Sequence, residues 1–363
     1  MLWAVHRLQP RVGLHGALES RILENHPYPQ KGGHRAGPDP SALSPSDAYV
    51  RRLRLAAQRL SPGAEAGSAH EAALAVCGVQ AQDVRAAGLA LRSRVPGLTR
   101  ADVDAAPLVR TWTVRGTVHL IAQEDRAWLH ALCAPRYGPR FEAMLAKRGG
   151  LDTAREMLDD IVDLLAEEPR GRAALLAELA SRGHPDLGTY AVNVLVPWAN
   201  QQGLVVGLAD GRLRASDPPP AVDFDEALAT MARRYLAGHG PAGAEDLAHW
   251  SGQPLSVARR ALDAAGPFEP ASEPPRVPAL KLLAGFDTTM LGHRSRGWLV
   301  PPEHDRRILP GGGMLRPVAL SRGVGAGTWR HGARGLEVDW FGPPAGARAL
   351  RAEAADVARY LGL

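Results

Sequence analysis

The chain has 363 residues, of which 43 are Lys or Arg and 38 are Asp or Glu, giving a formal net charge of +5 at pH 7. This length exceeds that of one ordinary domain, so two or three packed units are expected. The only two cysteines, Cys77 and Cys133, lie too far apart for a disulfide framework or a thiolate zinc site, and we expect neither a metal nor a cofactor.

The positive charge suits a polyanionic partner but does not select one, because a GC-rich genome enriches Arg, Ala, Gly and Pro in any protein. The sequence contains no run of about 20 apolar residues that would span a membrane. Its apolar start ends at His6 and Arg7, too early for a signal peptide. We therefore expect a cytoplasmic, nucleoid-associated protein with no membrane partner.

The first 43 residues lack hydrophobic periodicity and contain Gly32-Gly33 and Pro38-Asp39-Pro40, so a disordered extension is expected over 1–43. Order is expected from residue 44. Helices are predicted over 48–60, 68–77 and 83–94, and strands over 108–121. Three helices followed by strands is the order of a winged helix, so 44–148 is predicted to be a first winged-helix unit.

The same order recurs twice. Helices over 152–166, 172–181 and 190–202, the last kinked at Pro197, precede a hairpin of 204–207 and 212–214 that turns at Asp210-Gly211. This predicts a second winged helix over 149–220. After three prolines, a helix over 225–237 and a helix-turn-helix over 243–264 predict a third over 221–275.

The remaining segment, 276–363, is rich in Gly and Pro, with short apolar runs at 279–283 and 317–320 and a closing helix over 346–361. It is predicted to be a small β-rich, barrel-like domain. The predicted fold is thus mainly α with β: three tandem winged helices and a C-terminal β-rich domain.

The first candidate site is the pair Gln80 and Gln82, at the entry to the helix predicted over 83–94. Residues two apart in an extended segment point the same way, so the two amides can converge. An amide pair offers donors and acceptors without charge, enough to orient a water molecule. The alternative, which an isolated Gln-x-Gln favours, is that one glutamine caps the helix and the other is solvated.

The second candidate segment is 109–120. Its alternation predicts a strand with a polar face and an apolar face, the polar one consisting of Thr111, Thr113, Arg115 and Thr117. Arg and Thr beside Gly116 are what a wing that contacts the DNA backbone needs. A polar strand face that covers a buried Trp112 is the simpler alternative.

Together these segments resemble the AlkZ-like winged-helix DNA glycosylases, interstrand-crosslink glycosylases found in producers of DNA-alkylating antibiotics. The resemblance runs from residue 46 to the end, in family order, through 55–60, 78–92, 110–120, 234–241, 246–252, 285–287, 310–317 and 327–330. One stretch departs from the family: an acidic residue before an Arg is expected after Phe286-Asp287, where this chain has Ser295-Arg296.

The resemblance implies winged helices and a β-domain around a DNA-binding cleft, with Gln80 and Gln82 as the catalytic Gln-x-Gln motif. Gln82, where a sister branch carries Asp, implies the AlkZ-like branch. The implied partner is double-stranded DNA carrying alkylated purines or crosslinks, bound by a monomer. The candidate DNA contacts are Arg85, Arg110, Arg115, Thr117 and His119.

The predicted reaction is hydrolysis of the N-glycosidic bond of N7-alkylguanine, including bulky adducts or interstrand crosslinks from DNA-alkylating natural products, in repair or antibiotic self-resistance. Such a base is already positively charged and leaves neutral, so no general acid is needed and placing a water can suffice. Two alternatives stay open. A non-catalytic winged-helix transcription regulator leaves the glutamines without a role, and a protein that sequesters the alkylating compound would release no base.

Overall fold

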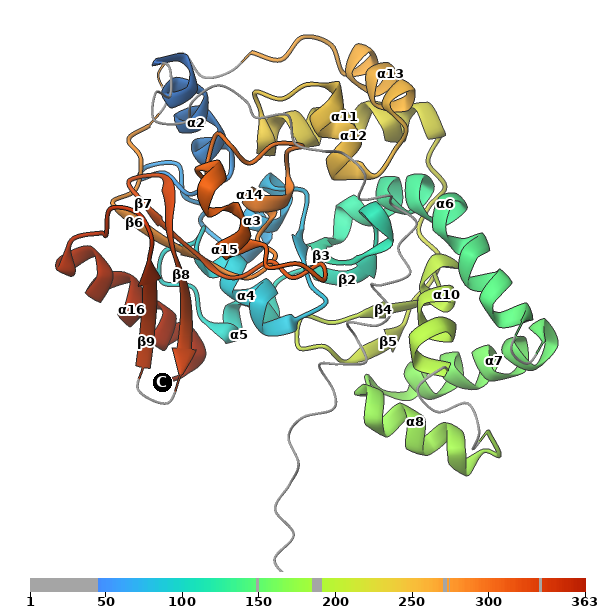
Figure 1. Ribbon diagram of the computed structural model, residues 1–363. Coiled ribbons are helices and arrows are strands. Elements are labelled where there is room, and N and C mark those ends of the chain that lie inside the picture. Colours follow the sequence, from blue (N-terminus) through green and yellow to red (C-terminus); the bar gives the residue numbers. More distant parts are fainter. Residues whose placement is uncertain (1–44, 148–149, 185–190, 270–272, 274, 333–334) are drawn as a thin grey trace, which may run out of the picture.

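The structure is a computed structural model that describes residues 45–147, 150–184, 191–269, 273, 275–332 and 335–363 (Figure 1). The extension predicted over 1–43 lies outside these residues. Within the described ranges, no helix is both long and apolar enough to cross a membrane.

The first elements are helices set by local caps. They are α2 (Pro45–Ala57), α3 (Ala69–Ala75), α4 (Val84–Arg92) and α5 (Arg100–Ala105). Ser68 accepts a hydrogen bond from the Glu71 amide and Asp83 one from the Ala86 amide, so α3 and α4 begin where predicted. The sequence prediction missed α5, although Thr99 and Asp102 form a capping box.

The β-rich stretch predicted over 108–121 consists of two strands joined by a tight turn. Strand β2 (Leu108–Trp112) pairs antiparallel with β3 (Val118–Ala122), and β3 pairs with the short β1 (Val79–Gln80). Between β2 and β3 the Thr113 amide donates to the Thr117 carbonyl over 3.0 Å, and Arg115 has a φ of 58°. The continuous polar face predicted through Arg115 was therefore wrong, because strand alternation stops at Trp112.

The next segment is helical and closes with a hairpin. It consists of α6 (Arg126–Ala146), α7 (Leu151–Glu167), α8 (Arg172–Ser181), a π-helical turn (Ala191–Leu195), α10 (Val196–Gln201), β4 (Val205–Gly207) and β5 (Leu213–Ala215). The 21-residue α6 was not predicted. β4 pairs with β2, so both hairpins belong to one sheet of strand order β1-β3-β2-β4-β5.

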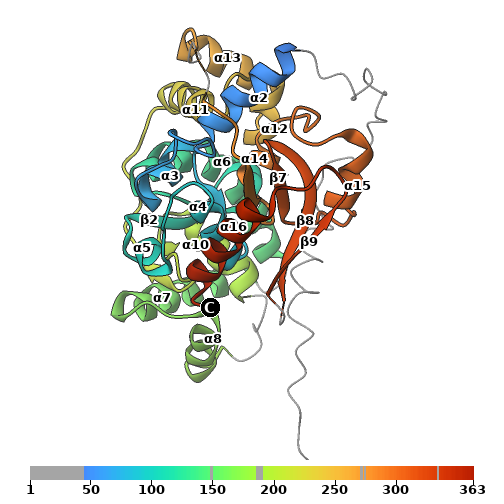
Figure 2. The ribbon, with the colours of Figure 1, turned by 90° about the vertical axis from the view of Figure 1, so that its left-hand side faces the viewer.

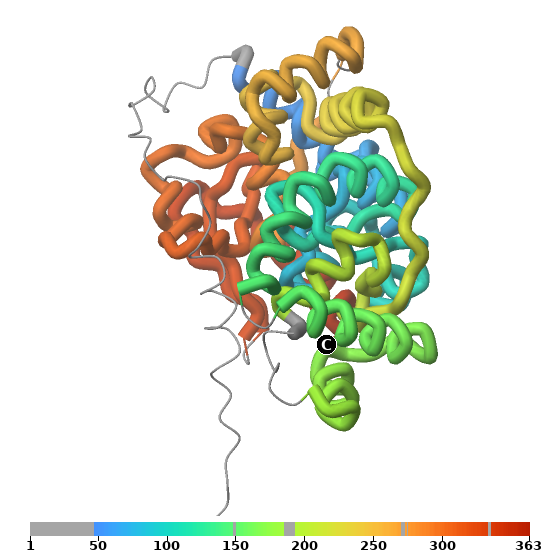
Figure 3. Tube along the Cα trace, turned by 90° about the vertical axis from the view of Figure 1, so that its right-hand side faces the viewer, coloured from blue at the N-terminus to red at the C-terminus, as the bar shows by residue number. Residues whose placement is uncertain are grey.

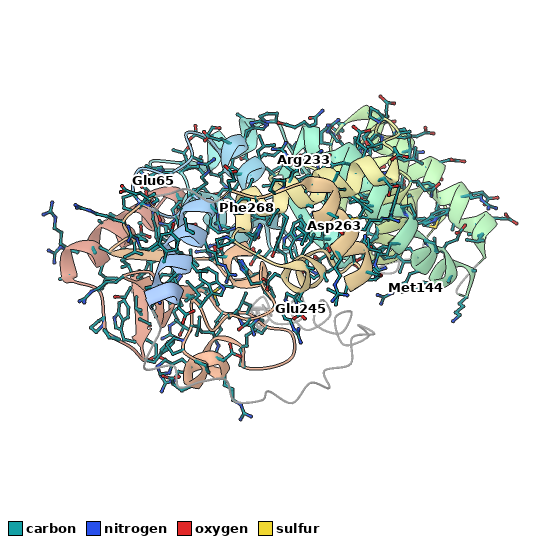
Figure 4. All side chains as sticks on the ribbon, turned by 90° about the horizontal axis from the view of Figure 1, so that it is seen from above. Glu65, Met144, Arg233, Glu245, Asp263 and Phe268 are labelled. Carbon is teal, nitrogen blue, oxygen red and sulfur yellow. The ribbon has the colours of Figure 1, made fainter. Side chains whose placement is uncertain are left out.

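Three further helices cover one end of the molecule: α11 (Phe224–His239), α12 (Ala244–Ser251) and α13 (Leu255–Ala265). Seen from above in Figure 4, Arg233 lies on α11 and Asp263 on α13. The described part of 221–275 contains no strand. The unit predicted there has its three helices but no wing of its own.

The C-terminal segment forms a second antiparallel sheet. Its elements are β6 (Leu280–Leu283), α14 (Thr288–Leu291), α15 (Asp305–Ile308), β7 (Val318–Ser321), β8 (Val324–Gly332), β9 (Gly335–Trp340) and α16 (Ala347–Leu361). The order β6-β7-β8-β9 is linear, so these strands form an open sheet, whereas a barrel-like domain was expected.

The two ends of the chain share one core. Helix α16 packs against β6 and α4 (Figure 2), and one buried apolar cluster contains residues of 66–120 together with residues of 280–360. Figure 3 shows the orange and red C-terminal elements alongside the blue and teal N-terminal ones. Arg92 of α4 is fully buried and pairs with Glu353 and Asp356 of α16 at 3.0 and 2.9 Å.

Candidate active site

Gln80 and Gln82 lie on one extended segment between β1 and α4. Gln80 is the last residue of β1 and pairs with His119, and the Ala81 amide donates to the Val118 carbonyl over 2.8 Å. The two side chains therefore point the same way, and Gln80 Nε2 donates to Gln82 Oε1 over 2.7 Å. The convergence predicted for the pair is confirmed.

Neither glutamine caps the helix. Asp83 does so, its carboxylate accepting from the Ala86 amide at 3.0 Å. Gln80 is 9% exposed and Gln82 is exposed. Within the described chain, Gln80 Oε1 and Gln82 Nε2 make no hydrogen bond, and neither is a fully buried atom. One acceptor and one donor of the pair thus face outward, available to a ligand or a water molecule.

Arg110 braces the backbone of this motif. From β2, its Nε donates to the carbonyl of Ala81, the residue between the two glutamines, over 2.7 Å. Its strand partner on β4 is Gly207, where a Cβ would lie 3.0 Å from the Arg110 Cβ, so a larger residue there would push Arg110 aside. The half-buried Arg110 is thus a positioning residue for the motif, and its contact with DNA stays a prediction.

Arg115 and Thr117 lie in the β2–β3 turn, which docks on α12. The Arg115 guanidinium donates to the Trp250 carbonyl, and Gly252 allows the close approach, since a Cβ there would lie 3.3 Å from the Arg115 Cα. Thr117 Oγ1 donates to the Val114 carbonyl over 3.1 Å. The segment expected to project as a wing therefore packs against a neighbouring helix, and its contacts with DNA stay predictions.

His119 is buried, with 4% of its surface exposed. Burial, and secondly the positive charge of Arg115, lower its pKa to about 3, so the ring is neutral near pH 7. Its Nδ1 lies 2.9 Å from Thr113 Oγ1 and 3.1 Å from the Thr117 carbonyl oxygen. A neutral ring cannot pair with phosphate as a cation, and the contact of His119 with DNA stays a prediction.

Arg85 is exposed on the first turn of α4. It lines a hollow of about 300 Å³ together with Arg100, Asp104 and Tyr360. Its contact with DNA stays a prediction, and it is the candidate whose position leaves the guanidinium most accessible to phosphate.

Asn200 and Gln201 of α10 hold strand β2 through hydrogen bonds. This role was not predicted from the sequence. Asn200 Oδ1 accepts from Thr111 Oγ1 at 2.9 Å and from the Trp112 amide at 3.1 Å, while its Nδ2 donates to the Val205 carbonyl over 2.7 Å. Gln201 Nε2 donates to the Trp112 carbonyl over 3.1 Å. Two amides at the end of an otherwise apolar helix were the available sequence indication.

Cys77 and Cys133 are buried free thiols, and burial raises the pKa of Cys133 to about 12. No group of three or more His, Cys, Asp or Glu side chains suited to a metal ion occurs in the described ranges.

Comparisons with known proteins assign the class. The family model described as DNA glycosylase AlkZ-like matches residues 73–360. A curated relative, the interstrand DNA cross-link repair glycosylase of Streptomyces sahachiroi, is 26% identical over 85% of this chain and 95% of its own length. The structure is similar to that of the Streptomyces sahachiroi DNA glycosylase AlkZ, with a TM-score of 0.68 and 21% identity over 87% of this chain and 96% of the other.

The protein is therefore a DNA glycosylase, an enzyme that hydrolyses N-glycosidic bonds. Because the family model spans most of the chain, it belongs to the AlkZ-like DNA glycosylase family.

Proposed function

We propose that the protein hydrolyses the N-glycosidic bond of N7-alkylguanine in double-stranded DNA, including bulky adducts and interstrand crosslinks formed by DNA-alkylating natural products, with Gln80 and Gln82 as catalytic residues. The observation that carries the proposal is the hydrogen-bonded amide pair, which has one acceptor and one donor facing outward. The adjacent carboxylate, Asp83, is engaged in capping α4.

The chemistry matches this uncharged site. In N7-alkylguanine the bond from C1′ to N9 breaks, its electron pair moves onto N9, and the purine leaves as a neutral base. The oxygen of water forms the new bond to C1′, and a proton passes to solvent. No acid has to protonate the leaving group. Placing the water then has to supply only part of the reduction in the activation free energy. A hundredfold increase in the rate of hydrolysis corresponds to about 2.7 kcal/mol.

The relative named as a cross-link repair glycosylase supports a crosslinked substrate. A crosslinked base cannot be extruded into a snug pocket, because it remains tied to the opposite strand. The exposure of Gln82 at the surface is compatible with attack on a base that stays in the duplex.

For the architecture we propose winged-helix units over 44–148 and 149–220, a third unit over 221–275 whose described residues form the helices but no strand, and the C-terminal β-domain over 276–363, in a monomer. The grouping of α3, α4 and α5 before β2 and β3, and of α7, α8 and α10 before β4 and β5, supports the first two. The hairpins of both units belong to one sheet.

The test is incubation with a duplex containing N7-methylguanine and with an N7-crosslinked duplex, measuring free base and abasic sites. Gln80→Ala and Gln82→Ala should each lower single-turnover excision at least a hundredfold, because each removes part of the water-placing pair, while DNA binding persists. The matched control is Gln123→Ala, which alters an exposed glutamine after β3 and should leave excision within twofold. Unchanged excision in the Gln80→Ala/Gln82→Ala double variant would contradict the assignment.

The same assay separates the alternatives. A transcription regulator would bind one undamaged sequence tightly and release no base. A protein that sequesters the alkylating compound would protect DNA from modification without producing abasic sites.

A further inference from the structure

His119 faces the same side of the sheet as the glutamine pair. In the antiparallel pairing of β1 with β3 it lies directly opposite Gln80, and in the pairing of β2 with β3 it lies opposite Thr111. Directly opposite side chains project from the same face with Cβ atoms about 4.5–5.5 Å apart. Gln80, His119 and Thr111 therefore form a polar row across three strands, with Gln82 beside it.

The hydrogen bonds of His119 to the β2–β3 turn determine which of its ring nitrogens carries the proton. The Thr117 carbonyl, 3.1 Å from Nδ1, can only accept, and Thr113 Oγ1, 2.9 Å from Nδ1, can accept as well as donate, so a proton on Nδ1 is the arrangement that suits both neighbours. Because burial keeps the ring neutral, its other nitrogen, Nε2, carries no proton and is a hydrogen-bond acceptor.

Nε2 is also accessible. Within the described chain it makes no hydrogen bond, yet it is not among the fully buried atoms that lack a partner. The exposed 4% of this residue therefore includes Nε2. The histidines His239 and His293 differ in this respect, because each has a fully buried Nδ1 without a partner.

We propose that His119 is a third catalytic group, whose Nε2 accepts one hydrogen bond from the attacking water while Gln80 Oε1 accepts the other. A water that donates both protons to two fixed acceptors directs its lone pairs away from them, toward C1′. Gln82 Oε1 holds the Gln80 amide in the required orientation through the 2.7 Å hydrogen bond. This inference rests on the proposed glycosylase function and adds a residue to the same site.

The hydrolysis does not require His119 to take up a proton. The bond from water oxygen to C1′ forms as the bond from C1′ to N9 breaks, the electron pair neutralises the purine, and the proton of the attacking water goes to solvent. His119 orients the water and does not have to retain the proton, consistent with a ring that burial keeps neutral.

Two substitutions separate this role from a structural one. His119→Asn places a side-chain amide where Nδ1 was, so it can keep the bond to Thr117 but has nothing at the position of Nε2. His119→Gln reaches the position of Nε2 with an amide oxygen but gives up Nδ1. On a duplex with N7-methylguanine, we expect His119→Asn to lose at least thirtyfold in single-turnover excision with unchanged duplex binding and melting temperature. His119→Gln should excise at least tenfold faster than His119→Asn.

A purely structural role predicts the opposite order, with His119→Asn active and His119→Gln impaired, and that result would overturn the proposal. The control His70→Asn alters a histidine that pairs with Glu124 at the surface, and its excision should stay within twofold. If His119→Asn releases base at the rate of the unaltered protein while Gln80→Ala releases none, the role of His119 is overturned and the proposed function stands. Absence of base release by the unaltered protein overturns the proposed function as well.

A measurement on the unaltered protein covers the case in which a variant does not fold. Nitrogen-15 NMR of the histidine rings should show His119 at pH 7 with its proton on Nδ1 and none on Nε2. A proton on Nε2 would remove the acceptor and contradict the proposal.

Discussion

At the scale of single residues, the site is a set of neutral groups whose orientation depends on their neighbours. Gln80 is oriented by Gln82, and the carbonyl between them by Arg110. Arg110 was predicted from the sequence to contact the DNA backbone, whereas its Nε serves the protein itself. Whether a given arginine positions the motif or neutralises phosphate therefore has to be tested by separate readouts.

Arg110→Met keeps the length of the side chain and removes the donor to Ala81. Because a hydrogen bond from a charged group contributes about 1.5–3 kcal/mol, we expect excision at saturating enzyme to fall about tenfold or more. Duplex affinity and its salt dependence should change little. The comparison is Arg85→Met, which should weaken binding and reduce the slope of log K against log salt by about 0.9, with excision at saturation maintained. If Arg110→Met flattened the salt dependence with normal excision, the positioning role would be refuted.

At the scale of elements, the β2–β3 hairpin is held at both ends by helices distant in sequence. Its turn is bound to α12 through Arg115, and Trp112 at the end of β2 is bound to α10 through Asn200 and Gln201. The second hairpin extends the same sheet, as the pairing of Arg110 with Gly207 shows. The sequence pattern assigns the two hairpins to separate units, whereas in the structure they belong to one sheet.

Asn200→Leu should destabilise the protein by about 3–5 kcal/mol. The substitution leaves Thr111 Oγ1, the Trp112 amide and the Val205 carbonyl without their buried partner, and each unsatisfied group costs about 1–3 kcal/mol. Urea unfolding measures the change. Gln202→Ala, at the neighbouring exposed position, should stay within about 0.5 kcal/mol of the unaltered protein. Equal stabilities of the two variants would show that the hydrogen bonds of Asn200 do not stabilise the protein.

At the scale of the whole molecule, the C-terminal segment completes the core of the N-terminal one. Arg94, just after α4, is fully buried and pairs with Asp287, which caps α14, at 2.8 Å. Gln58 and Thr289 complete the network, both with Arg94 and with each other. The same interior holds three histidines in neutral form. Burial lowers the pKa of His119 to about 3 and of His293 to about 4, and burial followed by the neighbouring His293 lowers that of His239 far below its ordinary value.

Stability should therefore decrease on mild acidification. With an unfolded-state pKa of about 6.5, each of these histidines binds a proton more readily in the unfolded chain, so the stability present above pH 6.5 is lost as the pH falls toward the folded value. At pH 5 the loss is about 2 kcal/mol for each such histidine. Urea unfolding at pH 7 and pH 5 checks this. Between pH 8 and pH 7 the histidines are largely neutral in both states and should contribute little change. A free energy of unfolding that is equal at pH 7 and pH 5 would refute the expectation.

Local chemistry in the sequence determined where α3 and α4 begin and how the two glutamines are arranged. Ser68 and Asp83 begin α3 and α4 because their side chains cap the next turn, and Gln80 and Gln82 converge because an extended segment places residues two apart on one side. These interactions span no more than three residues, so the pattern alone predicts them. The order of the remaining family stretches, not the Gln-x-Gln spacing, indicated the DNA glycosylase.

Tertiary structure alone decided what the polar residues of 110–119 do. Arg115 was expected on a strand face and instead lies in a turn, bound to a carbonyl 135 residues away, and Thr111 bonds to Asn200, 89 residues away. His119 lies on a strand of the stretch that alternation predicted, but its burial, with 4% of its surface exposed, was not expected. Alternation says which side chains share a face and not what covers the face, because the covering elements come from distant parts of the chain.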